Sequence, residues 1–331
     1  MLIRYVIKRI LISIPVLLLI SFAVFMIIQL PPGSFIESKV DQMLREGTYD
    51  PVELDQLRRQ YRFDDPVPLQ YVNWMTHFVR GDLGDSFESE RPVVNILARV
   101  LPPTIAISIF TILFTWSVAF PFGIIAAVKR NTVYDYVLTF VGLTAMATPA
   151  FVVAIIFMVI MQRIDPNFDP TGLISEKFQD ASWLYWPKIK DLLKHIWIPV
   201  SILGLAGTAG MIRILRANVI DELKKQYVLC ARARGLHPVV VVLRYPVRVA
   251  INPLVSSVGL VLPQIISGSM IISIVMHLPT LGPKVLVALE SQDTYMAASC
   301  IFIQCILAIV GILISDILLS LVDPRIKFGS K

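Results

Sequence analysis

Six stretches of the chain are almost continuously apolar and carry no charged side chain. They cover residues 10–30, 101–128, 137–162, 196–212, 249–276 and 294–315. A helix needs about 20 residues to cross the roughly 30 Å hydrocarbon core of a bilayer. The pattern therefore predicts an all-α polytopic membrane protein with six transmembrane helices, the fourth of them short. An even number of spans places both ends of the chain on the same side.

The first apolar stretch resembles a secretory signal, because Arg4, Lys8 and Arg9 precede it. It is longer than the apolar region of a signal peptide, and Pro31 and Pro32 follow where a cleavage site needs small residues. We therefore expect an uncleaved signal anchor.

The segment 31–100 is polar and is predicted to form a small helical domain. Asp50 before Pro51 has the residues of an N-cap and a first helical position, and Asp65 before Pro66 repeats that signal. The sequence Gly81-Asp82-Leu83-Gly84 predicts a turn after the second of these helices.

The composition indicates the class of protein, and the charge distribution indicates the orientation of the chain in the membrane. The chain has 331 residues, of which 56% are hydrophobic and 16% charged, and this excludes a disordered chain or a nucleic-acid-binding protein. Segment 31–100 has 8 basic and 12 acidic residues, whereas segment 213–248 has 8 basic and 2 acidic ones. Because basic loops stay in the cytoplasm, we expect both termini and segment 213–248 to be cytoplasmic.

No pattern in the chain indicates a catalytic or metal centre. The three cysteines and four histidines lack the spacing of metal ligands, and no phosphate-binding loop of the type G-x-x-x-x-G-K-[ST] occurs. We therefore expect no catalytic residue, no metal and no cofactor on this chain, and no ATP bound by it.

The basic segment 213–248 is patterned as two helices around a glycine. Ile220, Leu223 and Tyr227 recur at helical spacing, and Asn218 or Asp221 is the expected cap at the start. Gly235 suits the position after a helix end, and a second short helix is expected from Pro238 towards Arg244. The pattern leaves two interpretations open, namely a knob that binds a partner protein or an amphipathic segment on anionic lipid.

The stretch Tyr227-Val228-Leu229-Cys230-Ala231-Arg232-Ala233-Arg234-Gly235-Leu236 resembles the ATPase-docking loop of ABC importer permeases in the oligopeptide/dipeptide/nickel family. Further matches to the family run in order along nearly the whole chain. They are Pro32-Gly33-Ser34, Tyr61 to Pro66, Gln70-Tyr71, Gly81 to Gly84, Ser86, Leu101 to Thr104, Gly123, Ala126, Ala127, Lys129, Asn131, Asp135, Pro149-Ala150-Phe151, Gly268-Ser269-Met270, Leu278-Pro279, Gly282 and Asp323-Pro324-Arg325. The first-span and outer-loop matches indicate the first of the two permease types.

The resemblance implies a type I importer permease fold with four successive segments. These are the N-terminus and first helix 1–30, the extracytoplasmic loop domain 31–100, the five-helix core 101–323 and the cytoplasmic tail 324–331. The implied partners are a second homologous permease, two ABC ATPase subunits that bind ATP and Mg²⁺, an extracytoplasmic substrate-binding protein and the lipid bilayer of a prokaryotic inner membrane. The implied docking residues are Tyr227, Ala231, Arg232, Ala233, Arg234, Gly235 and Leu236.

The same resemblance implies a cargo of short peptides, with oligosaccharides or nickel complexes as alternatives. Implied pathway or gate residues are Pro149, Phe151, Gly268, Ser269, Ser273, His277 and Pro279. The chain departs from the family at Ser273, where a glutamate is usual, and at His277 and Thr280, where glycines are usual. A secondary transporter or channel is the alternative from another class, but it would usually place ionisable residues at mid-membrane.

Overall fold

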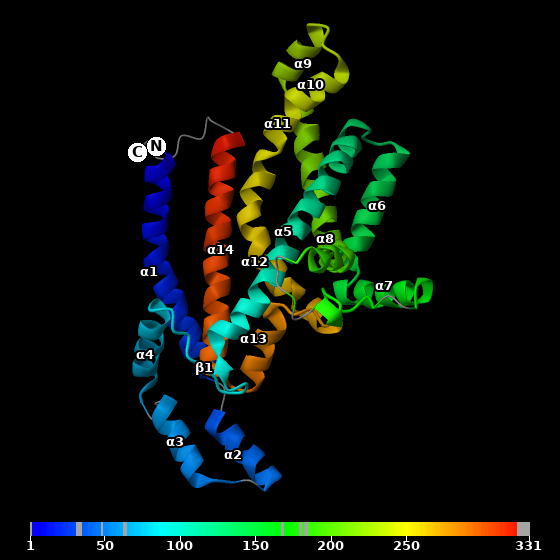
Figure 1. The fold of residues 1–331 in the computed structure, drawn as a ribbon. Helices are drawn as coiled ribbons and strands as arrows, with labels where there is room; N and C mark the ends of the chain where they lie inside the picture. Colours follow the sequence, from blue (N-terminus) through cyan, green and yellow to red (C-terminus); the bar gives the residue numbers. More distant parts are fainter. Residues whose placement is uncertain are drawn as a thin grey trace. The chain divides into compact units, whose positions relative to one another are not determined.

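The fold is known from a computed structural model, which describes residues 2–30, 35–47, 49–61, 65–166, 169–178, 181 and 185–322 (Figure 1). The sequence matches at 32–34 and 323–325, part of the match at 61–66 and the tail 324–331 lie outside these residues.

The regular secondary structure of the described residues consists of helices and one short hairpin. The first half contains α1 (Leu2–Ile28), α2 (Phe35–Glu46), α3 (Pro51–Tyr61), α4 (Val67–Val79), β1 (Asp85–Ser86), β2 (Arg91–Pro92), α5 (Val93–Val128), α6 (Val133–Ala147) and α7 (Ala150–Ile164). The second half contains the 3₁₀ turn η1 (Glu176–Phe178), α8 (Trp186–Leu223), α9 (Gln226–Ala233), α10 (Pro238–Arg244), α11 (Pro246–Ala250), α12 (Asn252–Val275), α13 (Leu281–Glu290) and α14 (Thr294–Val322). β1 and β2 pair antiparallel, with Ser86 opposite Arg91.

The chain forms two compact units. Unit 1 comprises Met1–Ile7, Pro103–Pro279 and Leu307–Lys331, and unit 2 comprises Lys8–Pro102 and Thr280–Ile306. Three of the four boundaries fall inside the long helices α1, α5 and α14, and the fourth falls between α12 and α13.

Four helices of the described residues are long and apolar enough to cross a membrane: α1, α5, α8 and α14. They contain the first, second, fourth and sixth predicted spans. The fourth span was predicted as short, yet α8 has 38 residues and continues well beyond both ends of the apolar run. The fifth predicted span corresponds to α12, whose backbone forms 24 helical residues.

The third predicted span, 137–162, is not one straight helix. α6 and α7 pass the same length and composition test only as a pair, and they are bent by 100° at the break (Figure 1). The break falls at Thr148, which is extended, and Pro149, which precedes the first residue of α7. Because a residue before proline is driven out of the helical region, this Thr-Pro pair turns the chain sharply.

Buried side chains of unit 1 form two main clusters. One contains Ile107 of α5, Ala154 of α7, Ile198 of α8 and Ile272 of α12. The other joins α5, α8 and the segment 247–254 around the fully buried Leu215. Both clusters are held by α5 and α8, so these two helices are the centre of unit 1.

A buried carboxylate links two separate segments of unit 2. Asp293 precedes α14 and accepts hydrogen bonds from the Ser86 hydroxyl at 2.6 Å and from the backbone N–H of Met296 at 3.0 Å. The second bond caps the helix, and the first ties the hairpin to it. Burial raises the pKa of the Asp293 carboxyl, while these hydrogen bonds act in the opposite direction.

The polar loop of unit 2 confirms the predicted helix cap at Asp50 and the glycine turn, but the predicted cap at Asp65 is wrong. The Asp50 side chain accepts a hydrogen bond from the backbone N–H of Val52 at 2.8 Å, as expected of an N-cap before Pro51. α4 begins at Val67, with Pro66 rather than Asp65 in the capping position. The glycine turn is also present, because Gly84 donates its N–H to the Asp82 carboxylate at 3.0 Å.

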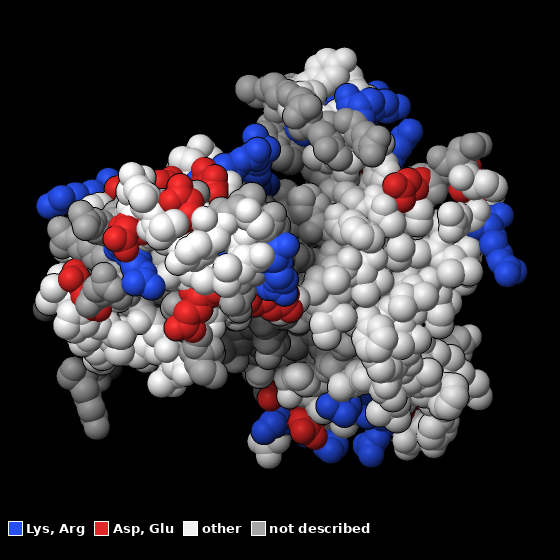
Figure 2. All heavy atoms as spheres, turned by 90° about the horizontal axis from the view of Figure 1, so that it is seen from below, with Lys and Arg blue, Asp and Glu red and all other residues white. Residues whose placement is uncertain are grey.

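Large apolar side chains cover much of the molecular surface. Leu19 of α1 and Phe140 of α6 are each 71% exposed. Figure 2 shows a broad area of the surface without Lys, Arg, Asp or Glu. A water-soluble protein rarely exposes so much contiguous apolar surface, so this pattern fits helices that contact lipid.

Candidate docking loop and pathway residues

The predicted docking segment forms a knob beyond the end of α8. α9 and α10 are two short helices joined by a tight turn, and α11 leads back towards α12 (Figure 1). All of these elements belong to unit 1. The knob therefore has the helix, glycine turn and second helix that the sequence predicts.

A small apolar core fixes the two helices of the knob to each other. Val228 and Ala231 of α9 are buried against Val241 of α10, with Leu223 and Tyr245 packed around them. Val228 and Ala231 are three positions apart and therefore share one face of α9. Leu229, Cys230 and Arg232 of α9 lie outside this core and are exposed.

Gly235 makes the turn between the two helices. Its φ is +74°, in the left-handed region, and its N–H donates to the carbonyl of Arg232 at 2.9 Å. This is the expected conformation of the residue after a helix C-cap, where glycine has no steric penalty. Nothing lies within 4 Å of the position that a Cβ would occupy, so only the backbone conformation demands glycine here.

Most of the other predicted docking residues lie on the surface of the knob. Arg232, Ala233, Arg234 and Leu236 are all exposed, and only Ala231 is buried. Tyr227 is 39% exposed, and its hydroxyl donates a hydrogen bond to the carboxylate of Glu222 at the end of α8. Partial burial, followed by this bond, raises the pKa of the Tyr227 hydroxyl, which keeps it protonated. The bond orients the first residue of the docking sequence.

The predicted start of the docking helix is wrong. Asn218 and Asp221 lie inside α8, which runs on to Leu223, and α9 begins separately after Lys225. Lys225 is extended, with ψ of 148°, so it interrupts the helix. The apolar spacing from Ile220 to Tyr227 continues across this break, and spacing alone therefore did not reveal it.

The predicted pathway residues lie on α7, on α12 and just after α12. Pro149 precedes α7 and is exposed, and Phe151 in its first turn is 39% exposed. Gly268 is exposed on α12, whereas Ser269 and Ser273 are buried four positions apart. The structure brings these two regions together, because Ala150 and Ala154 of α7 join the same apolar cluster as Ile272 of α12.

A Schellman motif ends α12 and places His277 in an unusual conformation. The N–H of His277 donates to Ile274, and the N–H of Leu278 donates to Ser273. His277 has φ of +51°, a region that favours glycine. A glycine would adopt this conformation without a steric penalty, whereas the histidine adopts it under strain. Pro279 follows on the surface.

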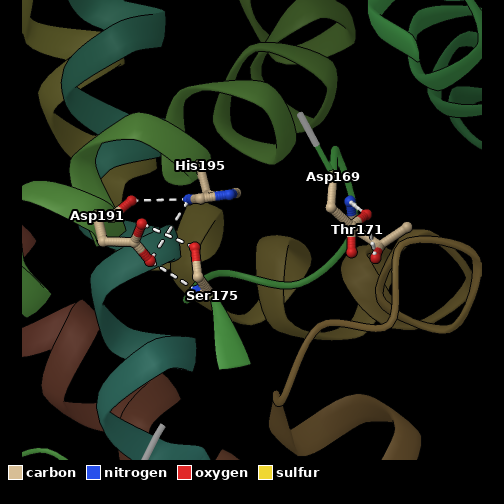
Figure 3. A network of polar contacts seen from close by, with 5 residues as sticks. All are labelled: Asp169, Thr171, Ser175, Asp191 and His195. Carbon is tan, nitrogen blue, oxygen red and sulfur yellow. Dashed lines mark hydrogen bonds and ion pairs between the residues drawn. The ribbon is translucent and has the colours of Figure 1, made fainter. Parts of the chain in front are cut away.

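A polar network beside this end of α12 was not predicted from the sequence (Figure 3). The Asp191 carboxylate of α8 accepts two hydrogen bonds from Ser175, from its N–H at 2.6 Å and its hydroxyl at 2.8 Å. His195 Nδ1 lies 2.8 Å from the Asp191 carbonyl oxygen. In the same loop, the Gly172 N–H donates to the Met276 carbonyl at 2.7 Å. These bonds hold the loop 169–178 between α8 and α12.

Although the network contains Ser, His and Asp, the geometry of its hydrogen bonds is suited to holding the loop in place. Both Asp191 oxygens accept from Ser175, and His195 Nδ1 lies 3.8 Å from the nearer of them. Leu173, in the same loop, is 1% exposed and joins the apolar cluster of unit 1. Within the described residues, no group of His, Cys, Asp and Glu side chains is arranged to hold a metal ion. The network anchors the loop.

An ion pair between α6 and α8 was also missed. Asp135 is 2% exposed and accepts from Arg216 Nε at 2.6 Å and from a terminal Arg216 nitrogen at 2.7 Å. The N–H of Asn131 adds a third bond at 2.9 Å. The partners are 81 positions apart, and only the folded chain shows that they meet.

Two family models match successive parts of the chain. Residues 119–328 match the binding-protein-dependent transport system inner membrane component, and residues 1–108 match the N-terminal membrane component of such systems. Together they include α1, the polar loop of unit 2, the docking knob and every predicted pathway residue.

Full-length relatives are similar at low identity. The oligopeptide transport system permease protein AppB of Bacillus subtilis (strain 168) is 29% identical over 325 residues, which cover 98% of this chain and 99% of that protein. The glutathione transport system permease protein GsiC of Salmonella choleraesuis (strain SC-B67) is 29% identical over 328 residues, with the same coverage. The dipeptide transport system permease protein DppB of Alkalihalophilus pseudofirmus is 26% identical over 343 residues, again covering 98% and 99%.

Proposed function

We propose that this chain, which belongs to the family of binding-protein-dependent transport system inner membrane components, carries short peptides across the membrane. It is the permease subunit of an ABC importer. The observation that carries the peptide proposal is the similarity, along 98% of the chain, to permeases named for oligopeptides, dipeptides and glutathione. Oligosaccharides and nickel complexes are the alternatives that a cargo experiment must separate from peptides.

The proposed topology has six spans with both termini in the cytoplasm. Four are α1, α5, α8 and α14, and the bent pair α6–α7 is the fifth candidate. α12 completes the set, because it is 24 residues long and has no charged residue. The basic segment that contains the knob then faces the cytoplasm, in agreement with the distribution of basic loops. The polar segment 31–100 is the extracytoplasmic domain.

The proposed role of the knob is to bind an ATPase subunit and pass on its movement. A knob suits this task because its apolar core and its bond to α8 make it move as one piece with the long helix. Arg232 and Arg234 are exposed on it and offer charge to acidic residues of a partner. ATP and Mg²⁺ belong to the ATPase subunits, and this chain is proposed to bind neither.

The proposed assembly contains a second homologous permease, two ATPase subunits and an extracytoplasmic substrate-binding protein. When the ATPases close on ATP, the knobs move with them, and the helices switch access of the central pathway from one side to the other. Residues on α7 and α12 are proposed to line or gate this pathway. The buried hydroxyls of Ser269 and Ser273 belong to the helix that carries the proposed gate.

The complex reconstituted in liposomes with its binding protein tests the cargo. We expect short peptides to stimulate ATP hydrolysis, while oligosaccharides and nickel complexes leave it at the basal rate. Stimulation by sugars or nickel complexes alone would overturn the peptide proposal. Uptake without any ATPase partner would instead indicate a secondary transporter or channel.

A further inference from the structure

An apolar groove lies where the end of α5 meets α10. Its walls are Ile124, Ile125, Val128 and Lys129 of the α5 end and Pro238, Val239, Val242 and Leu243 of α10, and its volume is about 210 Å³. An apolar cavity of about 150 Å³ already holds a benzene-sized molecule. The groove therefore has room for part of a hydrocarbon chain. All eight residues belong to unit 1.

The groove walls are open to the surroundings. Val128, Val239 and Leu243 are each more than half exposed. Leaving such side chains in water costs about 25 cal/mol for each Å² of apolar surface. A hydrocarbon occupant would remove this cost.

The charge at the groove is positive. Lys129 forms part of the wall, its ammonium lies 4.2 Å from the centre of the Tyr134 ring, and Arg130 follows it on the surface. Within the described part of the chain, no carboxylate forms an ion pair with Lys129. The nearby Asp135 is already bound to Arg216. An exposed lysine whose stem lines an apolar groove suits a molecule with an anionic head and an apolar tail.

Taken together, the geometry points to a binding site for an anionic phospholipid. We propose that one acyl chain occupies the groove and that the phosphate group lies beside Lys129. Basic residues at a membrane surface attract anionic lipids in this way, at about 1 kcal/mol each. A zwitterionic lipid would fill the groove without gaining the full attraction.

This lipid would act on the knob. The groove uses one face of α10, whereas Val241 on another face packs against Val228 and Ala231 of α9. A bound acyl chain therefore completes the burial of α10 and stabilises the element that carries the docking sequence. The inference concerns the membrane around this subunit and does not depend on the identity of the cargo.

Photo-crosslinking of the assembled importer tests the site. Two probes would be compared in otherwise identical vesicles, namely phosphatidylglycerol and phosphatidylcholine, each with a photoactivatable group in one acyl chain. We expect phosphatidylglycerol to label peptides that contain 124–129 or 238–243. K129Q should lower this labelling about fivefold and leave phosphatidylcholine labelling unchanged. V239W should fill the groove and lower labelling by both probes.

K190Q is the matched control, because it removes an exposed lysine that also lies against an aromatic ring, Trp186, but near the start of α8 and outside the groove wall. We expect it to change phosphatidylglycerol labelling less than twofold. Equal labelling of these peptides by both probes in the wild-type importer would overturn the proposal. So would labelling that appears only after the ATPase subunits are removed, because a protein would then be the occupant.

Discussion

Arg216 on α8 donates two hydrogen bonds to the Asp135 carboxylate at the start of α6, with N–O distances of 2.6 and 2.7 Å. The pair joins α6, which is followed by α7, to α8, the long helix that ends at the docking knob. Two parallel bonds between a guanidinium and a carboxylate fix both distance and orientation. α6 and α8 are therefore expected to move together.

Replacing Asp135 by Asn should destabilise unit 1. The change leaves the Arg216 charge without its carboxylate, and breaking a buried pair costs about 3 kcal/mol or more. We expect the lower end of that range, because the Arg216 side chain is 28% exposed. Thermal unfolding followed by tryptophan fluorescence would measure the effect. Asp221→Asn is the control, since it removes only the exposed pair with Lys224. Equal melting temperatures for the two variants would refute this role.

Replacing Tyr227 by Phe should loosen the knob without unfolding the subunit. The variant loses the hydrogen bond to Glu222, worth at most about 1 kcal/mol at this partly exposed site. We expect near-normal assembly but less cargo imported per ATP hydrolysed. Glu222→Ala should have the same effect, because it removes the acceptor of the same hydrogen bond. An unchanged ratio of uptake to hydrolysis in both variants would show that the bond is dispensable.

The same hydrogen bond should weaken as the solution becomes strongly alkaline. Burial and then Glu222 raise the pKa of the Tyr227 hydroxyl above its ordinary value of about 10. The folded chain thus holds this proton more tightly than the unfolded chain. The resulting stabilisation is complete below about pH 10 and is lost as the pH rises through the folded pKa. An ultraviolet difference titration of wild type against Tyr227→Phe would measure it, and ionisation of Tyr227 at or below the ordinary value would contradict the geometry.

Replacing His277 by Gly should raise stability by up to about 1 kcal/mol. The left-handed conformation costs a side chain about 1–2 kcal/mol, part of which glycine loses again through its freer unfolded state. His277→Val should lower stability, because a β-branched residue fits this region worst. Denaturant unfolding would compare them. Gln292→Gly, at the equivalent position after α13 with φ of +55°, should behave alike. A destabilised His277→Gly would mean that the imidazole makes a contact worth more than the strain.

The sequence predicted local features better than long-range ones. The helix cap at Asp50, the turn at Gly235 and the short helix from Pro238 were all foreseen, because each follows from the conformational preference of one or two residues. The apolar runs likewise located the long helices. Function came from the order of many weak matches, which the family models confirm along the chain.

The remaining features depend on residues far apart in the chain. The Asp135–Arg216 pair joins positions 81 residues apart, and Ser86 and Asp293 are separated by 207. The conformational preferences of individual residues do not predict such long-range contacts. The 100° bend at Pro149 divides a stretch that was predicted as a single span, because a proline indicates a break but not the direction of the next helix. The end of α8 was predicted at the wrong position, because the helical spacing of apolar residues continues past it without a change.

The central claim is that the knob around Gly235 couples ATP hydrolysis to import, and peptide uptake per ATP by Gly235→Val tests it most directly. Valine at φ of +74° would force the turn to rearrange, whereas Gly81→Val imposes equal strain at φ of +83° outside the knob. Neither added side chain meets a neighbouring atom within 4 Å at its Cβ. In liposomes containing the whole complex, Gly235→Val should hydrolyse ATP without importing peptide, while Gly81→Val keeps the wild-type ratio. Wild-type uptake by Gly235→Val would contradict the coupling role of the knob.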